Sequence, residues 1–185
     1  MLNLEYIFWF FFALIIFHYV GFGLVVMILG KLFGQKNRAT EMTDSELPTV
    51  SFIIAAYNEE RIIEQKIKND LCLDYPKDKL EIIIVSDGST DSTQHIIQNL
   101  QKSSSLITAL HSPERKGKTA ALNRAIAIAK NEILVFSDAN SFFKTDALKK
   151  LVRHFSEPRI GGVCGRKSIL FHEGRKASLG DRLYW

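Results

Sequence analysis

The stretch that decides the fold is EIIIVSDGSTD, residues 81–91. Its apolar, mostly β-branched half is typical of a strand buried on both faces, and Asp87 follows where that strand ends. The segment EILVFSDAN, residues 132–140, repeats the arrangement with Asp138. In an open α/β sheet, ligands collect outside the carboxyl ends of the strands. Two carboxylates delivered there predict a polar ligand and a hard cation.

Around these segments the apolar pattern alternates between a strand period and a helix period. Strands are expected over residues 49–56, 80–86, 106–111 and 132–137, and a fifth is expected to open at 160–164. Helices are expected over residues 59–71, 90–102, 118–130 and 148–155. Repeated strand-then-helix order predicts an α/β fold with a mostly parallel, Rossmann-like sheet. The loops after its first, second and fourth strands then share one edge.

The N-terminal end of the chain is different in character. Residues 6–30 are 25 consecutive positions without Lys, Arg, Asp or Glu, and they are dense in Phe, Leu, Ile and Val. As a helix they would be roughly 37 Å long, enough to cross a hydrocarbon core of about 30 Å. A cleaved signal peptide fits less well, because Glu5 stands where a basic region belongs. A buried core helix fits less well still, since the run has no polar face. We therefore expect a transmembrane helix.

The charges around this run predict its orientation. Lys31, Lys36 and Arg38 follow it, and no Lys or Arg precedes it. We expect the protein at the cell membrane, held by the single N-terminal span seen in this sequence. By the positive-inside rule, the rest of the chain is expected in the cytoplasm. The chain then divides into a transmembrane anchor, a juxtamembrane linker and a domain, over residues 1–34, 35–48 and 49–185.

The overall composition disfavours some partners. The net charge is +4, yet Lys and Arg are dispersed among acidic residues and no aromatic residues are interleaved with them. This pattern predicts no nucleic acid partner, and it favours an anionic small molecule or anionic lipid headgroups. Cys72 and Cys164 are far apart and belong to no metal-ligand pattern, so we expect free, buried thiols.

Each aspartate turn also has an ordinary explanation. Asp87-Gly88 is a common turn dipeptide, but here it joins a buried strand to a helix rather than two antiparallel strands. Asp138 and Asn140 are two residues apart, so in an extended chain their side chains point the same way and could meet one hard cation. Both patterns are short, so the argument for a ligand site depends on their position at the ends of strands.

A basic loop, KGKT at residues 116–119, precedes the third expected helix and suggests a phosphate loop. A Walker motif needs Gly where Ser112 stands, so that interpretation fails. Lys118 is nevertheless well placed for a diphosphate, because free backbone N–H groups and the helix dipole attract anions at a helix start. A solvated basic loop explains Lys116 equally well.

Taken together, four motifs resemble those of the family 2 inverting glycosyltransferases. They are PTVSFIIAAYNEE at 48–60, DGSTD at 87–91, Lys118 with Leu122-Asn123, and SDAN at 137–140, in the order of the family. The resemblance covers about residues 48–166. It implies that the N-terminal transmembrane helix is followed by a partial GT-A domain. It also implies a nucleotide-diphosphate sugar donor, most often a UDP-sugar.

The resemblance assigns donor-binding roles to five positions. Ala55, Tyr57 and Glu59 would line the nucleoside pocket. Asp87 would accept a hydrogen bond from the base, and Lys118 would face the diphosphate. All five stand within the four motifs, in loops or strand ends that the parallel sheet places at one edge.

The resemblance also implies a metal site. Asp138 and Asn140 match the DxD motif, which together with the diphosphate holds Mg²⁺ or Mn²⁺. Many relatives have a second Asp where Asn140 stands, and the neutral amide removes one anionic ligand.

The catalytic base of the family and its Gln-x-x-Arg-Trp acceptor motif have no match in this sequence. No catalytic residue is therefore assigned, and the base is expected beyond Trp185. We expect a fragment that holds the donor-binding half, lacks the end of the domain and is inactive alone.

The activity implied for the full-length protein is transfer of a sugar to an acceptor hydroxyl with inversion. Cell-surface or exopolysaccharide biosynthesis suits a cytoplasmic domain on a membrane anchor, because nucleotide-sugar donors are cytoplasmic. Two alternatives remain. A sugar-nucleotidyltransferase has a related sheet, but it usually carries a Gly-rich loop where residues 57–60 stand here. A non-catalytic, membrane-anchored nucleotide-sugar-binding protein would fit the missing base.

Overall fold

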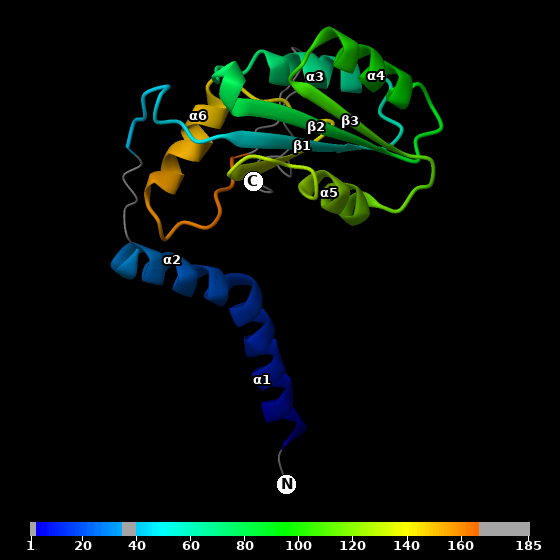
Figure 1. Cartoon of the computed structure of the whole chain (residues 1–185). Coiled ribbons are helices and arrows are strands. Elements are labelled where there is room, and N and C mark those ends of the chain that lie inside the picture. Colours follow the sequence, from blue (N-terminus) through cyan, green and yellow to red (C-terminus); the bar gives the residue numbers. More distant parts are fainter. Residues whose placement is uncertain (1–2, 35–39, 167–185) are drawn as a thin grey trace, which may run out of the picture. The chain divides into compact units, whose positions relative to one another are not determined.

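The computed structural model describes residues 3–34 and 40–166. The chain forms two compact units, residues 1–38 and residues 39–185 (Figure 1). The first contains a long helix and the second an α/β domain.

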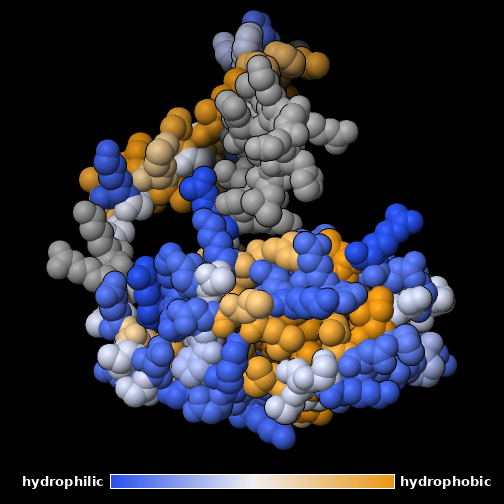
Figure 2. Space-filling view, turned by 90° about the horizontal axis from the view of Figure 1, so that it is seen from above, coloured by the Kyte–Doolittle hydropathy of each residue, from blue (hydrophilic) through white to orange (hydrophobic). Residues whose placement is uncertain are grey.

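The N-terminal unit is one apolar helix of 30 residues, Leu4–Phe33. It consists of α1 (Leu4–Ile16), a π-helical turn (Phe17–Gly21) and α2 (Phe22–Phe33), and it bends at that turn (Figure 1). No residue of this helix is buried, and most of its visible surface is coloured as hydrophobic in Figure 2. At ~1.5 Å per residue it is roughly 45 Å long, so its length and composition suffice to cross a membrane.

The domain is built on four parallel strands in the order β3-β2-β1-β4. The strands are β1 (Val50–Ala56), β2 (Leu80–Asp87), β3 (Ile107–Ser112) and β4 (Ile133–Asp138). The helices are α3 (Ile63–Leu71), α4 (Thr93–Ser103), α5 (Lys118–Ile126) and α6 (Ala147–Val152), with 3₁₀ turns at Lys77–Lys79 and Arg153–Ser156. The predicted α/β class and parallel sheet are confirmed.

Apolar side chains cover both faces of the sheet. On one face, under α3, α4 and α6, the buried residues include Phe52, Ile54, Ile63, Ile67, Ile82, Ile84, Ile97 and Leu148. On the other face, Ile53, Ile83 and Val85 pack against Ala121 and Ala125 of α5. Figure 1 shows α3 and α4 on one side of the strands and α5 on the other. Burial on both faces explains why the strands read as continuous apolar runs.

The structure differs from the sequence-based expectations in a few places. Helix α3 begins at Ile63 rather than at residue 59, because the preceding residues hydrogen-bond to a neighbouring loop. Residues 160–164 form no strand within the described part of the chain; two glycines interrupt their apolar run. Cys72 and Cys164 are free thiols as expected, but both are exposed rather than buried, Cys72 because it ends α3.

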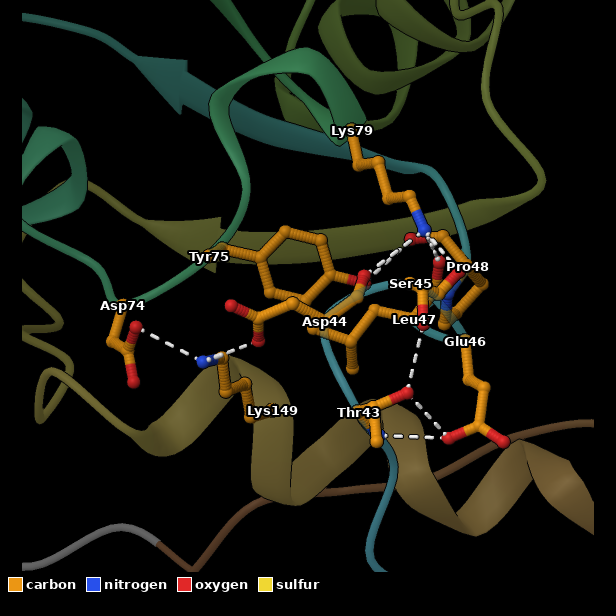
Figure 3. A network of polar contacts seen from close by, with 10 residues as sticks. All are labelled: Thr43, Asp44, Ser45, Glu46, Leu47, Pro48, Asp74, Tyr75, Lys79 and Lys149. Atoms are coloured by element: carbon orange, nitrogen blue, oxygen red, sulfur yellow. Dashed lines mark hydrogen bonds and ion pairs between the residues drawn. The ribbon is translucent and has the colours of Figure 1, made fainter.

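The segment 43–48 is fastened to the domain at the amino-terminal end of β1 (Figure 3). The Nζ of Lys79 donates hydrogen bonds to three of its backbone carbonyls, those of Asp44 (3.1 Å), Ser45 (2.7 Å) and Leu47 (2.8 Å). The hydroxyl of Tyr75 donates to the carbonyl of Pro48 at 2.5 Å. These contacts fix the chain before it enters the sheet, on the edge opposite to the carboxyl ends of the strands.

Helix α3 carries a buried ion pair beneath aromatic rings. The Nζ of Lys66 lies 2.7 Å from Oδ1 of Asp70, and neither side chain is exposed. The ammonium lies 5.0 Å from the ring centroid of Phe52 and 4.8 Å from that of Phe143. Burial lowers the pKa of Lys66 and raises the pKa of Asp70 to about 6, against the attraction between the partners. The pair therefore gives Phe143, which follows β4, a defined place against the sheet.

Candidate functional site

The two aspartates that end strands lie at the same edge of the sheet. Strand β1 lies between β2 and β4, and the register pairs Ala56 with Ser86 and Ala55 with Asp138. Asp87, one residue after Ser86, and Asp138 therefore flank the carboxyl end of β1 from both sides. The expectation that these loops share an edge is confirmed.

The loop after β1 is tied to the turn after β2. Asn58 has a left-handed backbone with φ 54°, which Asn tolerates, and its Oδ1 accepts the N–H of Thr90 at 2.9 Å. In the other direction, Oγ1 of Thr93 accepts the N–H of Glu59 at 2.8 Å. Because hydrogen bonds run both ways, the loop that carries Tyr57 is held against the start of α4 and the turn before it.

Asp87 fastens a second loop to the end of β2. Its Oδ2 accepts the N–H groups of Lys116 (3.1 Å) and Gly117 (2.7 Å), and its Oδ1 accepts Nη2 of Arg124 at 2.6 Å. The side chain of Asp87 is only 5% exposed. Burial alone would raise its pKa, but the Arg124 contact and the two backbone donors outweigh burial and lower the pKa. Asp87 is therefore an ionised anchor for the loop that leads into α5.

Close backbone approach brings this second loop beside Tyr57. Gly88 has φ 69°, and a Cβ built on it would lie 2.4 Å from the backbone N of Arg115, so only glycine fits. The Cζ of Arg115 lies 3.9 Å from the ring centroid of Tyr57, a cation–π distance. The edge thus presents an aromatic ring with a guanidinium on its face.

Lys118 lies at the part of this edge that carries Asp138. It is the first residue of α5, and its Nζ forms an ion pair with Oδ1 of Asp138. Both side chains are more than half exposed, so the pair contributes little to stability and can be exchanged for a ligand. The free N–H groups at the start of α5 add to the positive potential here.

The donor set at Asp138 and Asn140 fits a shared metal site. Both side chains are exposed, in a turn where the N–H of Ser141 donates to the carbonyl of Asp138 at 3.1 Å. Within residues 3–34 and 40–166, no group of three or more His, Cys, Asp or Glu could hold a metal ion. A carboxylate and an amide oxygen are ligands that Mg²⁺ and Mn²⁺ accept, but they are too few for a full shell. They suit a cation that takes its other ligands from phosphate and water.

Sequence reasoning missed Arg115 and Arg124. Arg115 belongs to the same basic loop as Lys118, which is a signal that could have found it. The contact of Arg124 with Asp87 spans 37 residues and has no local signal. Of the residues that were predicted, Ala55 packs its side chain into the core under α5, so it joins the site only as the partner of Asp138 in the register.

A hollow of about 410 Å³ lies at the opposite edge of the sheet, near segment 43–48. Its charged lining residues are Glu46, Lys79 and Glu132. Two carboxylates against one ammonium leave this lining with a net negative charge. That lining disfavours an anionic ligand, in contrast to the basic edge around Lys118.

Comparisons with known proteins identify relatives of this chain. The family described as Glycosyl transferase family 2 matches residues 51–183. A beta-monoglucosyldiacylglycerol synthase of Nostoc sp. (strain PCC 7120) is 34% identical over 143 residues, which is 76% of this chain and 31% of that protein. A poly-beta-1,6-N-acetyl-D-glucosamine synthase of Staphylococcus aureus (strain COL) is 33% identical over 134 residues, 72% of this chain and 32% of that protein. The chain thus spans about a third of the length of these curated relatives.

Solved structures show the same fold. The mannosyltransferase PcManGT from Pyrobaculum calidifontis, in complex with GDP-Man and Mn²⁺, has a TM-score of 0.71 and 31% identity over 81% of this chain and 44% of its own. S. aureus TarS 1-349 in complex with UDP-GlcNAc has a TM-score of 0.51 and 25% identity over 55% of this chain and 29% of its own. The family match over most of the domain, together with the GT-A fold of these neighbours, shows that this chain belongs to glycosyl transferase family 2.

Proposed function

We propose that the full-length protein transfers a sugar from a UDP-sugar to an acceptor hydroxyl with inversion, and that the domain seen here binds the donor. The observation that carries this proposal is the shared edge, where Asp87 and Asp138 flank the end of β1 and Lys118 contacts Asp138. The bound GDP-Man and UDP-GlcNAc of the two solved relatives support a nucleotide-sugar donor. The glycolipid and polysaccharide synthases among the relatives support a cell-surface or exopolysaccharide product.

In this proposal the nucleoside occupies the half of the edge around Tyr57. The base lies against the Tyr57–Arg115 pair, which offers a flat apolar surface and a positive charge, with Glu59 at the border of the pocket. Asp87 accepts a hydrogen bond from the base. Its two oxygens already accept three protein donors, but a carboxylate has about four acceptor positions, so one is left.

The diphosphate occupies the half of the edge around Lys118. The ammonium of Lys118 and the free N–H groups of α5 neutralise its charge, and Asp138 with Asn140 would hold Mg²⁺ or Mn²⁺ beside it. When bound, such a cation supplies Lewis-acid stabilisation of the departing diphosphate. A general base must deprotonate the acceptor hydroxyl, and we assign none among the described residues.

Nucleotide binding tests this assignment. UDP should bind the purified chain, held in detergent micelles with Mn²⁺, at least about tenfold more tightly than UMP, because only UDP carries the second phosphate that reaches Lys118. Isothermal titration calorimetry with UDP, GDP and UMP measures the difference. Equal affinities for UDP and UMP would contradict the diphosphate site, and tighter binding of GDP than of UDP would replace uracil by guanine as the donor base.

We further propose that Leu4–Phe33 spans the membrane, with the domain in the cytoplasm. Glu5 lies in the first turn of this helix and Lys31 in its last turn, so the positive flank is on the domain side. External protease added to intact cells should leave the domain undigested, and should digest it once the cells are opened. Digestion of the domain in intact cells would reverse the proposed orientation.

A further inference from the structure

Helix α3 reaches across to the chain that follows β4. The side-chain amide of Asn69 pairs with both backbone groups of one residue: its Nδ2 donates to the carbonyl of Phe143 at 3.0 Å, and its Oδ1 accepts the N–H of Phe143 at 2.9 Å. Both contacts are partly buried. A planar amide that satisfies both groups fixes the orientation of the Phe143 backbone as well as its distance from the helix.

The side chain of Phe143 is held from two further directions. Its ring meets that of Phe52 edge to face, with centroids 5.2 Å apart, and the buried ammonium of Lys66 lies 4.8 Å from its centroid. Two residues later, the carbonyl of Thr145 accepts the N–H of Asp74 at 2.9 Å. Residues 143–145 are therefore attached to α3 and to the turn after it.

The other end of this segment is attached to the sheet. Asp138 is paired with Ala55 of β1, and Ala139 is buried in the core that α3 covers. The short stretch 139–142 thus runs between two fixed ends, and it includes Asn140.

We propose that Asn69 is a positioning residue for the cation-binding pair, holding residues 139–143 so that Asp138 and Asn140 keep the relative placement that a shared cation needs. This rests on the proposed function for the cation itself. Lys66 and Phe52 assist by seating the ring of Phe143. Catalytic and binding groups need support of this kind, because a displacement of about 1 Å can cost a large factor in function.

The chain offers a matched control for this role. The Nδ2 of Asn131 donates to the carbonyl of Val50 at 2.8 Å, also partly buried, just before β4 begins. Asn131→Ala therefore removes the same kind of hydrogen bond at the edge of the sheet that carries no proposed ligand.

Hydrogen exchange of the free chain in micelles, followed by mass spectrometry, tests the positioning without any ligand. Asn69→Ala should accelerate exchange of the amides of Ser141 and Phe143 by at least about tenfold, whereas Asn131→Ala should leave these amides unchanged. Unchanged exchange in Asn69→Ala overturns the proposal whatever the parent chain binds.

Calorimetry with UDP distinguishes a role of Asn69 in positioning the cation-binding pair from a role in the stability of the fold alone. In Asn69→Ala the gain in UDP affinity on adding Mn²⁺ should fall by about tenfold, with the affinity in EDTA preserved. In Asn131→Ala both should match the parent chain. If Mn²⁺ strengthens UDP binding in Asn69→Ala as much as in the parent chain, the positioning role is overturned. If Mn²⁺ does not strengthen UDP binding in the parent chain, the proposed function is contradicted, and the hydrogen-exchange result alone tests the attachment.

Discussion

The Asp87→Ala substitution should lower the free energy of unfolding by roughly 3 kcal/mol relative to the parent chain, because it breaks a nearly buried ion pair. Three donors lose their acceptor at once: the guanidinium of Arg124 and the N–H groups of Lys116 and Gly117. The lower end of the usual range applies, since the side chain of Arg124 is 31% exposed and water can reach it. The loop that leads into α5 then loses its attachment to β2.

Thermal unfolding followed by circular dichroism measures this loss as a drop in Tm of roughly 6–12 °C. Asp74→Ala is the matched control, because the side chain of Asp74 is 62% exposed and, among the described residues, its ion pair is with Lys149, so its Tm should stay within about 2 °C of that of the parent. Equal Tm values for the two variants would contradict the anchoring role of Asp87.

The pH dependence of the same difference has a definite sign. The pKa of Asp87 is lowered in the folded state, so its stabilising contribution is complete above the unfolded pKa of about 3.9 and is lost as the pH falls through the folded pKa. The gap in Tm between the parent chain and Asp87→Ala should therefore stay constant from pH 7 to about pH 5 and close below about pH 4. A gap that persists unchanged in acid would mean that the charge of Asp87 does not hold the loop.

Local pattern was sufficient for the sheet. Each of the four strands begins and ends within one residue of the expected bounds, because a strand buried on both faces is a continuous apolar run bounded by turn residues. The parallel order of β1, β2 and β4 then places Asp87 and Asp138 at one edge without any knowledge of side-chain contacts.

Contacts between distant residues were not accessible in the same way. The start of α3 was misplaced because Asn58 and Glu59 bond to the turn after β2, more than 30 residues away, rather than joining the helix. Asp87 was expected to accept a hydrogen bond from a nucleotide base, and its protein partners Lys116, Gly117 and Arg124, which come from another loop and helix, were not foreseen. No periodicity or motif in the sequence reports such pairs.

The expected fifth strand was wrong for a different reason. Residues 160–164 have the apolar composition of a strand opening, but a strand needs a partner with free backbone groups. The described residues supply no ladder for this stretch, and its two glycines weaken any extended preference.

The measurement that tests the central claim most directly is the Mn²⁺ dependence of UDP binding in the parent chain and in Asp138→Ala. In the parent chain, Mn²⁺ should strengthen UDP binding over EDTA by roughly ten- to a hundredfold, the value of one charge-assisted ligand contact of ~1.5–3 kcal/mol. In Asp138→Ala, UDP should bind with the same affinity in Mn²⁺ and in EDTA. The exposed carboxylate of Asp138 is the anionic protein ligand of the proposed cation, and the neutral amide of Asn140 cannot replace it. Lys118, freed from its ion pair, should keep the affinity in EDTA at least at the parent level.

Asp78→Ala is the control for this titration, since Asp78 is an exposed aspartate in the 3₁₀ turn Lys77–Lys79, just before β2 begins at the opposite edge. It should retain the full Mn²⁺ effect of the parent chain. Calorimetric titration of the three proteins in micelles gives the six affinities that decide the question. Loss of the Mn²⁺ effect in Asp138→Ala alone is the result that we predict, and an Asp138→Ala variant that binds UDP with Mn²⁺ as tightly as the parent chain would contradict the account.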